Sequence, residues 1–361
     1  MAKKRYGLLE MEESQQKKLN KLIKTKPFHK VDPEVKEMIL EQRKGRPRII
    51  DIHTHPYTKV GWRSLGKFRV YLDSYLYGRE STPESITEAA PTEDEWVEPF
   101  RELGVAVTPV GWDATTNMRY IQNDPLYRNN YNDEIAAMRD KYPDVVITGW
   151  GAVDPWQGRK ALAEVERCHK ELNLIGLKFQ QVGQAFHVND RQFYPLWDLC
   201  QDLGMPIQLH TGFTGLGSGA PGSMGLKISY TMQIFPDIDD IAADFPNLKI
   251  IMLHPSDGRD EDAMLLCRLK GNVYRELSGM WPEYIGHVSP HTWYEMNRRQ
   301  RNEYMFGSEF NLFPLDGVLW QHMQLPYRDG ILEDHVFYKN TINILGEEME
   351  RVGIDLKEWE G

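Results

Sequence analysis

The sequence has only three cysteines and no long apolar run. Cys168, Cys200 and Cys267 lie far apart among the 361 residues and form no CxxC pair. This spacing argues against a disulfide scaffold or a cysteine zinc site and is typical of a chain kept in a reducing cytosol. No apolar run approaches the roughly 18 residues of a membrane-spanning helix, so we expect no membrane partner. The basic opening segment lacks the apolar stretch of a signal peptide, and we expect a cytoplasmic protein.

The charge is divided unevenly along the chain. Residues 1–46 carry 13 Lys/Arg and 7 Asp/Glu, a net charge of +6, whereas the remainder carries 30 basic and 46 acidic residues, a net charge of −16. The basic segment has interleaved acids and few aromatic residues for base stacking, and the acidic remainder would repel a polyanion. We therefore expect no nucleic-acid partner. Residues 1–46 are interpreted as a charged N-terminal arm, either a solvated helix or a contact in a homodimer or higher homo-oligomer.

From residue 48 onwards, short apolar runs alternate with longer segments of helical pattern. Most of the runs lack strict alternation, which is typical of parallel strands buried on both faces. Helical segments such as 158–172 lie between them, and several end in Gly or Pro. Eight such units predict a (β/α)₈ TIM barrel over residues 47–361. The predicted strands are residues 48–55, 105–112, 145–153, 174–180, 206–212, 249–255, 272–279 and 303–310.

The alternative to a barrel is an open, doubly wound sheet. That fold expects a Gly-rich phosphate turn after its first strand, and here the first strand ends in His-Thr-His. Two long insertions, residues 56–100 and 213–235, follow strands. In a barrel both would lie on the C-terminal face, where active sites are formed. We therefore expect them to be long active-site loops that cover a substrate.

The segment Asp51-Ile52-His53-Thr54-His55 carries the strongest functional signal. Side chains at i and i+2 of a strand point to the same face, so His53 and His55 project together from the end of the first strand. Two converging imidazoles suit a divalent metal, for which the barrel supplies a shaped cavity.

Three further polar residues end apolar strands in matching positions. His210 closes PIQLH, His254 closes KIIMLH, and Glu309 lies at the end of the last strand in MFGSEF. Because the carboxyl ends of barrel strands share one face, we expect these residues to converge with the first pair. A carboxylate at Glu309 can complete a metal shell or move a proton. The other histidines stand in helical or loop contexts and are expected at the surface: His29, His169, His187, His287, His291, His322 and His335.

This constellation resembles the amidohydrolase superfamily, in particular the amidohydrolase-related family that includes aminocarboxymuconate-semialdehyde decarboxylase and the resorcylate-type decarboxylases. The resemblance covers roughly residues 48–346, through DIHTH, GLK, QLHTG, DIAADFPNLKIIMLHP, NVYRELSG, FGSEF and KNTINILG. It implies a (β/α)₈ barrel with one divalent metal ion, zinc in the first place and manganese as the alternative. It also implies His53, His55, His210 and Glu309 as metal ligands and His254 as an acid/base or polarising group.

Glu309 differs from the usual family pattern, and Lys178 leaves open whether the site holds one metal ion or two. The family usually has Asp at the eighth-strand position, and the extra methylene of Glu309 moves the carboxylate by about one bond length, enough to change coordination or proton-transfer geometry. Glu there is known among relatives that hydrate or hydrolyse. In binuclear members of the superfamily, a carboxylated lysine at the position of Lys178 bridges two metals. In this branch that lysine is more often structural or a substrate contact, and we expect a mononuclear site.

We expect a metal-dependent hydrolase of a small cyclic, aromatic or carboxylated compound. A bound Zn²⁺ lowers the pKa of its water to about 7. Glu309 would orient or deprotonate that water, and His254 would polarise the substrate carbonyl or protonate the leaving group. Two alternatives use the same metal site: a non-oxidative decarboxylase of an aromatic or unsaturated carboxylic acid, or a hydratase. An alternative of another class is a non-catalytic barrel that serves for binding or assembly. Expected contacts for a small-molecule substrate are Arg275, Lys178, Trp281, Tyr57 and Trp156, where an arginine can hold a carboxylate and aromatic rings can cover a ring.

Overall fold

Eight parallel strands form the centre of the described structure. The computed structural model describes residues 28–59, 82, 85, 88–112, 131–285 and 290–359, and the backbone of residues 4–6 and 9–11. The parallel strands are β3 (Ile49–Thr54), β4 (Val105–Pro109), β5 (Trp150–Gly151), β6 (Gly176–Phe179), β7 (Ile207–His210), β8 (Ile250–Leu253), β9 (Val273–Glu276) and β10 (Tyr304–Met305). Each lies within a predicted strand. The short strands β1 (Lys4–Tyr6) and β2 (Leu9–Met11) form a separate antiparallel pair.

Backbone contacts close the parallel strands into a barrel. β5 to β10 pair in sequence order as one ladder, and β3 pairs with β4. A parallel bridge between Thr54 and Phe310 joins the β10 side to β3, and a second between Val107 and Val146 joins β4 to the β5 side. The sheet therefore closes on itself, and the predicted barrel is confirmed.

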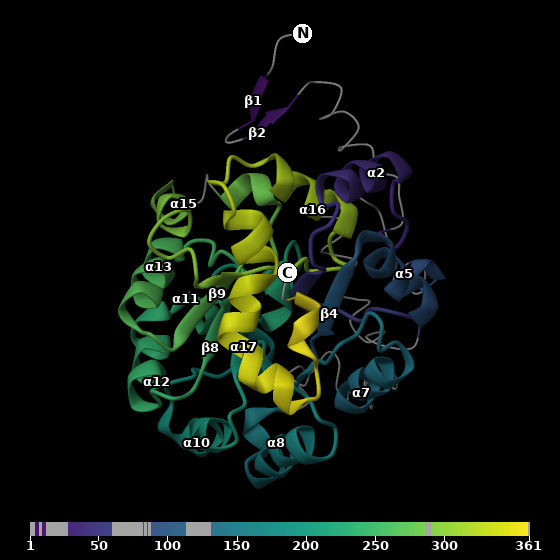
Figure 1. Cartoon of the computed structure of the whole chain (residues 1–361). Helices are drawn as coiled ribbons and strands as arrows, with labels where there is room; N and C mark the ends of the chain where they lie inside the picture. Colours follow the sequence, from purple (N-terminus) through teal and green to yellow (C-terminus); the bar gives the residue numbers. More distant parts are fainter. Residues whose placement is uncertain are drawn as a thin grey trace.

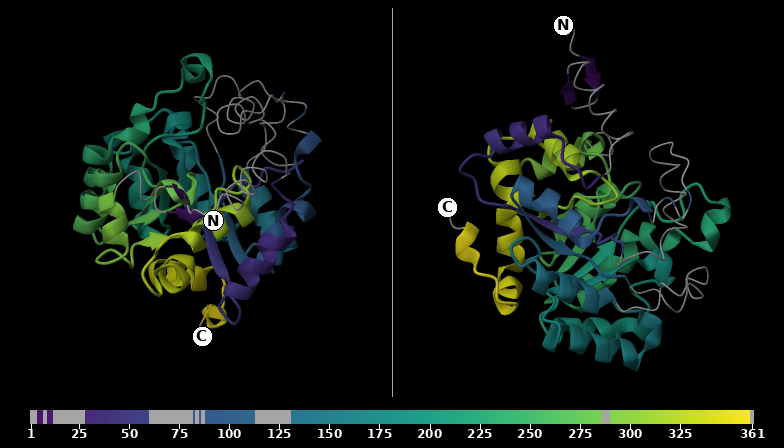
Figure 2. Two further views of the ribbon diagram at one scale, coloured as in Figure 1. Left: turned by 90° about the horizontal axis from the view of Figure 1, so that it is seen from above. Right: turned by 90° about the vertical axis from the view of Figure 1, so that its right-hand side faces the viewer.

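Helices follow the strands and surround them (Figures 1 and 2). The longer helices are α2 (Pro33–Gln42), α5 (Glu93–Leu103), α7 (Tyr131–Lys141), α8 (Arg159–Lys170), α10 (Tyr194–Asp202), α13 (Asp260–Leu269), α16 (Leu315–Gln324) and α17 (Asn340–Arg351). The shorter ones are α9 (Gln181–Gln184), α11 (Ser229–Met232), α12 (Asp239–Asp244) and α15 (Pro290–Met296). The 3₁₀ and π segments are η3 (Pro155–Gln157), η4 (Arg191–Phe193), η5 (Pro221–Gly225), η6 (Ile234–Ile238), η7 (Pro282–Tyr284), η8 (Ile331–Lys339) and η9 (Leu356–Trp359). None of the described helices is both long enough and apolar enough to cross a membrane.

Helix α5 shows how local sequence sets the bounds of an element. The hydroxyl of Thr92 accepts a hydrogen bond from the N–H of Glu95 at 3.2 Å, and the Glu95 carboxylate accepts one from the N–H of Thr92 at 2.9 Å. This reciprocal capping box satisfies donors that the first turn leaves free. Gly104, at φ +66°, ends the helix in a left-handed conformation that suits glycine, and β4 begins at the next residue.

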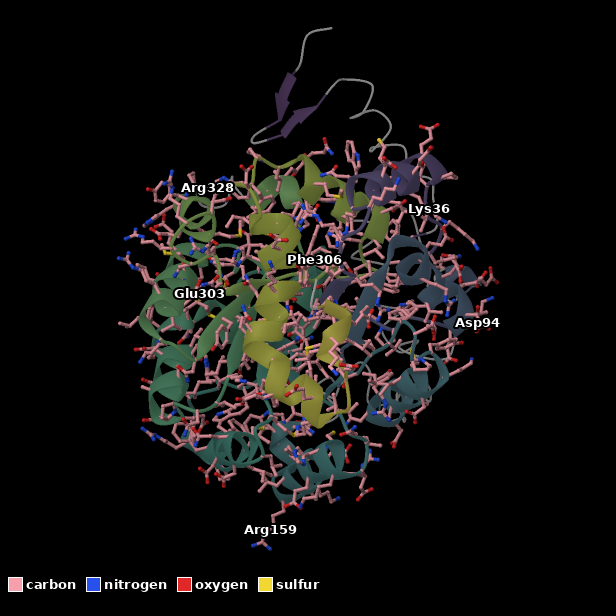
Figure 3. All side chains as sticks on the ribbon, viewed as in Figure 1. Lys36, Asp94, Arg159, Glu303, Phe306 and Arg328 are labelled. Carbon is pink, nitrogen blue, oxygen red and sulfur yellow. The ribbon has the colours of Figure 1, made fainter. Side chains whose placement is uncertain are left out.

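The strands are buried on both faces, as their continuous apolar sequences predict. In β8, Ile250 and Met252 belong to one apolar cluster, whereas the alternate residues Ile251 and Leu253 belong to another. The two faces of β8 therefore pack into different parts of the core. In Figure 3, labelled charged side chains such as that of Arg159 lie at the periphery of the molecule.

Helix α2 packs on the barrel although it lies within the predicted arm. Asp32 caps its first turn, and Val35 and Ile39 are buried in the same apolar cluster as the first barrel strands. The helix contacts α5 and α16. The arm is therefore part of the barrel's packing from Phe28 onwards. The use of residues 1–46 as a subunit contact stays a prediction.

His322 corrects the expectation that it lies at the surface. Its side chain in α16 is fully buried, with Nδ1 2.9 Å from the Tyr327 hydroxyl and the ring beside Phe306 and Phe337. The reason is that α16 is covered by α2, so no face of its first two turns reaches solvent. His322 is a core histidine, not a site residue.

The two long insertions differ in how much of them the structure describes. Most of residues 56–100 lies outside the described residues, and the described end forms α5. Residues 213–235 are described and contain η5 and α11. Gly212 lets this loop begin close to the next strand end, because a Cβ there would lie 2.4 Å from the carbonyl carbon of Ser256.

Candidate active site

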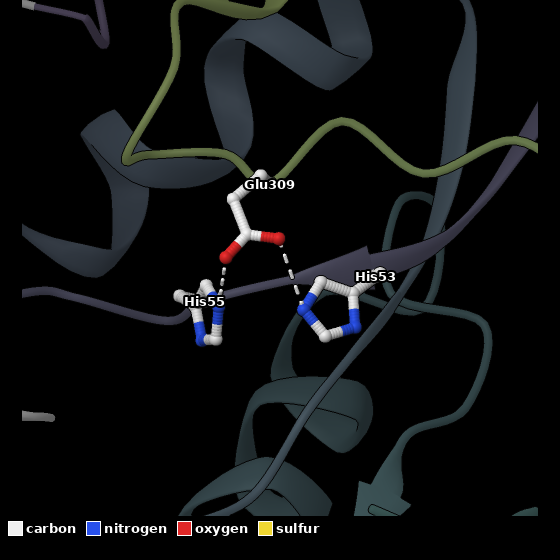
Figure 4. Close-up of side chains that lie close together, drawn as sticks. All are labelled: His53, His55 and Glu309. Carbon is white, nitrogen blue, oxygen red and sulfur yellow. Dashed lines mark hydrogen bonds and ion pairs between the residues drawn. The ribbon is translucent and has the colours of Figure 1, made fainter. Parts of the chain in front are cut away.

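His53, His55 and Glu309 meet at the C-terminal mouth of the barrel (Figure 4). Nε2 of His55 is 2.9 Å from Oε1 of Glu309, and Nε2 of His53 is 3.1 Å from Oε2. One ligand atom from each residue lies within 4.8 Å of the other two, and all three side chains are buried. Apart from the contact with Glu309, buried Nε2 of His53 has no hydrogen-bond partner among the described residues. Two nitrogen donors, one of them without a hydrogen bond, and a carboxylate fit a divalent metal ion.

The protonation states of this group also suit a metal. Burial opposes ionisation of Glu309, but the adjacent His53, His55 and His254 outweigh it and hold the pKa of this carboxyl well below its usual range. Burial lowers the pKa of His53 to about 4, against the influence of Glu309, and it lowers the pKa of His55 as well. The cluster therefore presents an ionised carboxylate and neutral imidazoles, the forms that bind metal ions.

Left-handed backbone conformations bring two of the site residues into position. Glu309 has φ +59° and His254 has φ +67°. For residues other than glycine this region is uncommon, and such residues concentrate at functional sites. The N–H of Glu309 donates to the carbonyl oxygen of His53 at 3.0 Å, which fixes the last strand against the first.

Asp51 braces the same two strand ends from below. Its Oδ1 accepts hydrogen bonds of 3.1 Å from the N–H of His53 and from the N–H of Ser308. Complete burial raises the pKa of Asp51 to about 7. Asp51 therefore supports the residues that carry His53 and Glu309 rather than reaching a metal itself.

His254 and His210 form a second pair next to the first group. Nε2 of His254 is 2.9 Å from Nδ1 of His210, and its Nδ1 is 3.6 Å from Oε2 of Glu309. The rings of His254 and His53 are 5.3 Å apart. Nε2 of His210 is 3.1 Å from the carbonyl oxygen of Phe213, so both nitrogens of His210 are engaged. The structure thus brings all five predicted residues together, with His210 joined through His254; its role as a metal ligand stays a prediction.

Lys178 stands inside the barrel, and no described acidic residue forms an ion pair with it. It lies on β6 between Leu177 and Phe179, which face the helices, and its side chain is 3 % exposed. Among the described residues no hydrogen bond or ion pair reaches its ammonium group, which lies over the Trp112 ring with Nζ 5.4 Å from the centroid. Burial lowers the pKa of Lys178 to about 8, while the nearby carboxylate of Glu309 opposes the shift. At neutral pH this is a cation that faces the metal-binding group.

Arg275 lies away from this cluster. Its guanidinium is buried against α13, where Nη2 donates to Oδ1 of Asp260 at 2.9 Å and to the carbonyl oxygen of Pro255 at 2.7 Å. Side chains alternate along a strand, so the neighbouring residue Glu276, and not Arg275, faces the histidines. The buried contacts with α13 occupy the guanidinium that was expected to hold a substrate carboxylate.

The three predicted aromatic contacts lie on loops of the barrel. Trp156 is 42 % exposed, and its indole N–H donates to the carbonyl oxygen of Gln184 at 2.8 Å. The ring of Trp281 packs 5.2 Å from that of Phe313. Tyr57 is buried just after β3. Within the described part of the chain, no hydrogen bond or ring contact joins Trp156 or Trp281 to the metal-binding group. The substrate role of Tyr57, Trp156 and Trp281 stays a prediction.

Glu276 and Ser278 belong to the site although no motif singles them out. Glu276 ends β9 and Ser278 follows two residues later, so both lie on the side that faces His254. The Ser278 hydroxyl contacts Glu309 at 3.0 Å. Burial raises the pKa of Glu276 well above its usual range. The signal in the sequence was the same i, i+2 spacing at a strand end that marks His53 and His55.

Comparisons with known proteins agree with this geometry. A family model described as amidohydrolase matches residues 50–335. No curated protein matches the chain. An uncharacterised TIM-barrel protein from Bordetella bronchiseptica has 20 % identity and a TM-score of 0.64, with 83 % of this chain and 99 % of that chain covered.

Two further solved structures are named decarboxylases. The 5-carboxyvanillate decarboxylase from Sphingomonas paucimobilis has 17 % identity and a TM-score of 0.55, with coverage of 83 % and 99 %. The 2,6-dihydroxybenzoate decarboxylase from Rhizobium has 14 % identity and a TM-score of 0.58, with coverage of 84 % and 99 %. At these identities the likeness shows a shared fold.

Proposed function

Because the chain belongs to the amidohydrolase family, with a potential metal site at its barrel mouth, we propose that it is a metal-dependent decarboxylase of a small aromatic or unsaturated carboxylic acid. The observation that carries the proposal is Lys178. A buried ammonium without an anionic partner is costly, and a substrate carboxylate placed beside it would remove that cost. The likeness to solved decarboxylases supports the same chemistry.

His53, His55 and Glu309 would hold one divalent ion, with His210 as a further ligand after it parts from His254. Such an ion polarises the oxygens of a bound acid. Solved structures of a 5-carboxyvanillate decarboxylase and a dihydroxybenzoic acid decarboxylase contain manganese. We propose zinc or manganese for this chain, and elemental analysis of the purified protein distinguishes them.

The residues of the chain would divide the reaction between binding and proton transfer. Lys178 would hold an anionic oxygen of the substrate, and Tyr57, Trp156 and Trp281 would supply aromatic surface at the loops. As the bond to CO₂ breaks, its electron pair stays on the carbon, which takes up a proton. That proton would come from a water molecule or from an acidic group of the substrate, and His254 and Glu309 are the groups placed to relay it to the carbon. CO₂ leaves as the second product.

Hydrolysis is the second candidate, and Glu309 is the observation that favours it. Its carboxylate spans both histidines, with one oxygen near His53 and the other near His55. A carboxylate in this position is suited to orient a water and accept its proton. His254 would then protonate the leaving group.

The experiment compares CO₂ release with hydrolysis by the same protein. The full chain loaded with Mn²⁺ is incubated with 5-carboxyvanillate, 2,6-dihydroxybenzoate and simpler aromatic acids, and CO₂ is measured in a coupled assay. We expect release that depends on the metal and is lost in His53→Ala. Turnover of lactones or esters without CO₂ release from any acid would replace the first candidate by the second. A protein that binds no metal would favour the non-catalytic barrel.

The remaining expectations concern the protein in the cell. We propose a cytoplasmic enzyme that forms a homodimer or higher homo-oligomer through residues 1–46. Light scattering of the full chain and of a variant without residues 1–27 tests the oligomer, and the packed helix α2 stays intact in both.

A further inference from the structure

The hydroxyl of Ser278 lies where three side chains of the site meet. Its oxygen is 3.0 Å from Oε2 of Glu309, 3.0 Å from Nδ1 of His254 and 2.8 Å from Oε2 of Glu276. Ser278 is 2 % exposed, so little solvent competes for these contacts. One buried hydroxyl therefore links the carboxylate of β10 to the histidine of β8.

Glu276 holds this hydroxyl in place. Its Oε1 accepts a hydrogen bond from the N–H of Ser278 at 2.5 Å, and its Oε2 accepts one from the N–H of His254 at 3.2 Å. The Glu276 side chain is fully buried. Its carboxylate thus contacts the backbone of Ser278 and of His254, whose side chains both face Glu309.

Two glycines leave the space that this arrangement needs. A Cβ on Gly307 would lie 1.9 Å from Oε1 of Glu276. A Cβ on Gly279, which has φ +76°, would lie 2.3 Å from Nδ1 of His254. Neither distance is possible for a real side chain, so the chain keeps glycine at both points where the network touches the backbone.

We propose that Ser278 is a positioning residue that sets the orientation of the Glu309 carboxylate and the His254 ring, and that Glu276 anchors it. The inference rests on the metal site of the proposed function. Glu309 is held on one side by His53 and His55 and on the other by Ser278. Among the described residues, Ser278 is the only one whose hydroxyl donates to Oε2 of Glu309. Without this hydroxyl, the carboxylate can rotate away from the metal position. Outer partners of metal ligands typically change metal affinity about 10–100-fold.

Metal binding by the full chain tests the proposal without a known substrate. Ser278→Ala removes one oxygen atom, and we expect it to raise the Kd for Mn²⁺, measured by electron paramagnetic resonance, about 10–100-fold. The matched control is Ser256→Ala, because the Ser256 hydroxyl is equally buried but pairs with Thr211 at 2.6 Å. We expect its Kd to change by less than about 3-fold. Ser278→Thr keeps the hydroxyl and is expected to recover most of the affinity.

The visible spectrum of the Co²⁺-loaded proteins reports the ligand geometry directly. At saturating Co²⁺ we expect a shifted spectrum for Ser278→Ala and an unchanged one for Ser256→Ala. Equal Kd values and equal spectra for the two alanine variants overturn the proposal, and this comparison decides even if Ser278→Thr fails to fold. An unmodified chain that binds neither metal overturns the proposed function and this inference together, whereas tight binding by every variant overturns only this inference.

Discussion

At the scale of single residues, the proposed contact between Lys178 and a substrate carboxylate can be tested by substitution. Lys178→Met removes the charge and keeps most of the volume, so the chain should bind metal normally but lose recognition of an acid. A hydrogen bond to a charged group contributes about 1.5–3 kcal/mol, so we expect kcat/KM for an aromatic acid to fall roughly 10–100-fold. The exposed Lys170, which pairs with Glu166 on α8, provides the control variant Lys170→Met. An unchanged kcat/KM in Lys178→Met would contradict the role.

The same residue predicts a pH dependence. Burial lowers the pKa of Lys178 to about 8, so its cationic form is lost as the pH rises through that value. Recognition of an anion is therefore present below pH 8 and declines above it. We expect kcat/KM for an acid to fall on the alkaline side and this limb to move to higher pH in Lys178→Arg, whose guanidinium stays charged. If kcat/KM falls at the same alkaline pH in both proteins, the titration of a group other than Lys178 causes the fall.

His53 gives the sharpest test of the metal site. His53→Ala removes one of the nitrogen donors, and we expect the Kd for Mn²⁺ to rise roughly 100-fold or more, beyond the effect of an outer partner. His187→Ala is the control, because His187 pairs with Asp237 outside the site and is partly exposed. Similar Kd values for the two variants would show that the metal binds elsewhere.

At the scale of elements, burial explains which parts of the fold are predictable. The eight strands could be located because a strand buried on both faces needs an unbroken apolar run. The charge of residues 1–46 gives a misleading picture of α2, because the buried Val35 and Ile39 stand between charged residues in its sequence. In β9 the sequence does not reveal which side chain faces the barrel interior. Arg275 and Glu276 are adjacent, and the pairing of β9 with its neighbouring strands decides which of the two faces inward. Contacts between strand ends, such as those of Ser278, depend on the closed barrel, so the i, i+2 spacing of Glu276 and Ser278 does not predict which residues they contact.

The packing of helix α2 on the barrel can therefore be tested by its contribution to stability. Ile39→Ala should lower the free energy of unfolding by about 2–4 kcal/mol, because it opens a cavity in a core that α2 shares with the barrel. Leu40→Ala, one residue further along and 42 % exposed, should change it by less than about 0.5 kcal/mol. Urea unfolding followed by circular dichroism measures both. If both substitutions change the free energy of unfolding by the same small amount, α2 does not contribute to the stability of the barrel and belongs to the arm.

At the scale of the whole molecule, the metal should link the two ends of the barrel sheet. His53 and His55 come from the first parallel strand and Glu309 from the last, so an ion held by all three stabilises the closure between β3 and β10. A ligand that binds only the folded state at 100 times its Kd adds about 2.7 kcal/mol. We expect chelation to lower the Tm by a few degrees and added Mn²⁺ to restore it, and His53→Ala to abolish both responses while His187→Ala retains them. A chelator effect of the same size in His53→Ala would place the stabilising ion outside the barrel mouth and leave the closure to the backbone bridges alone.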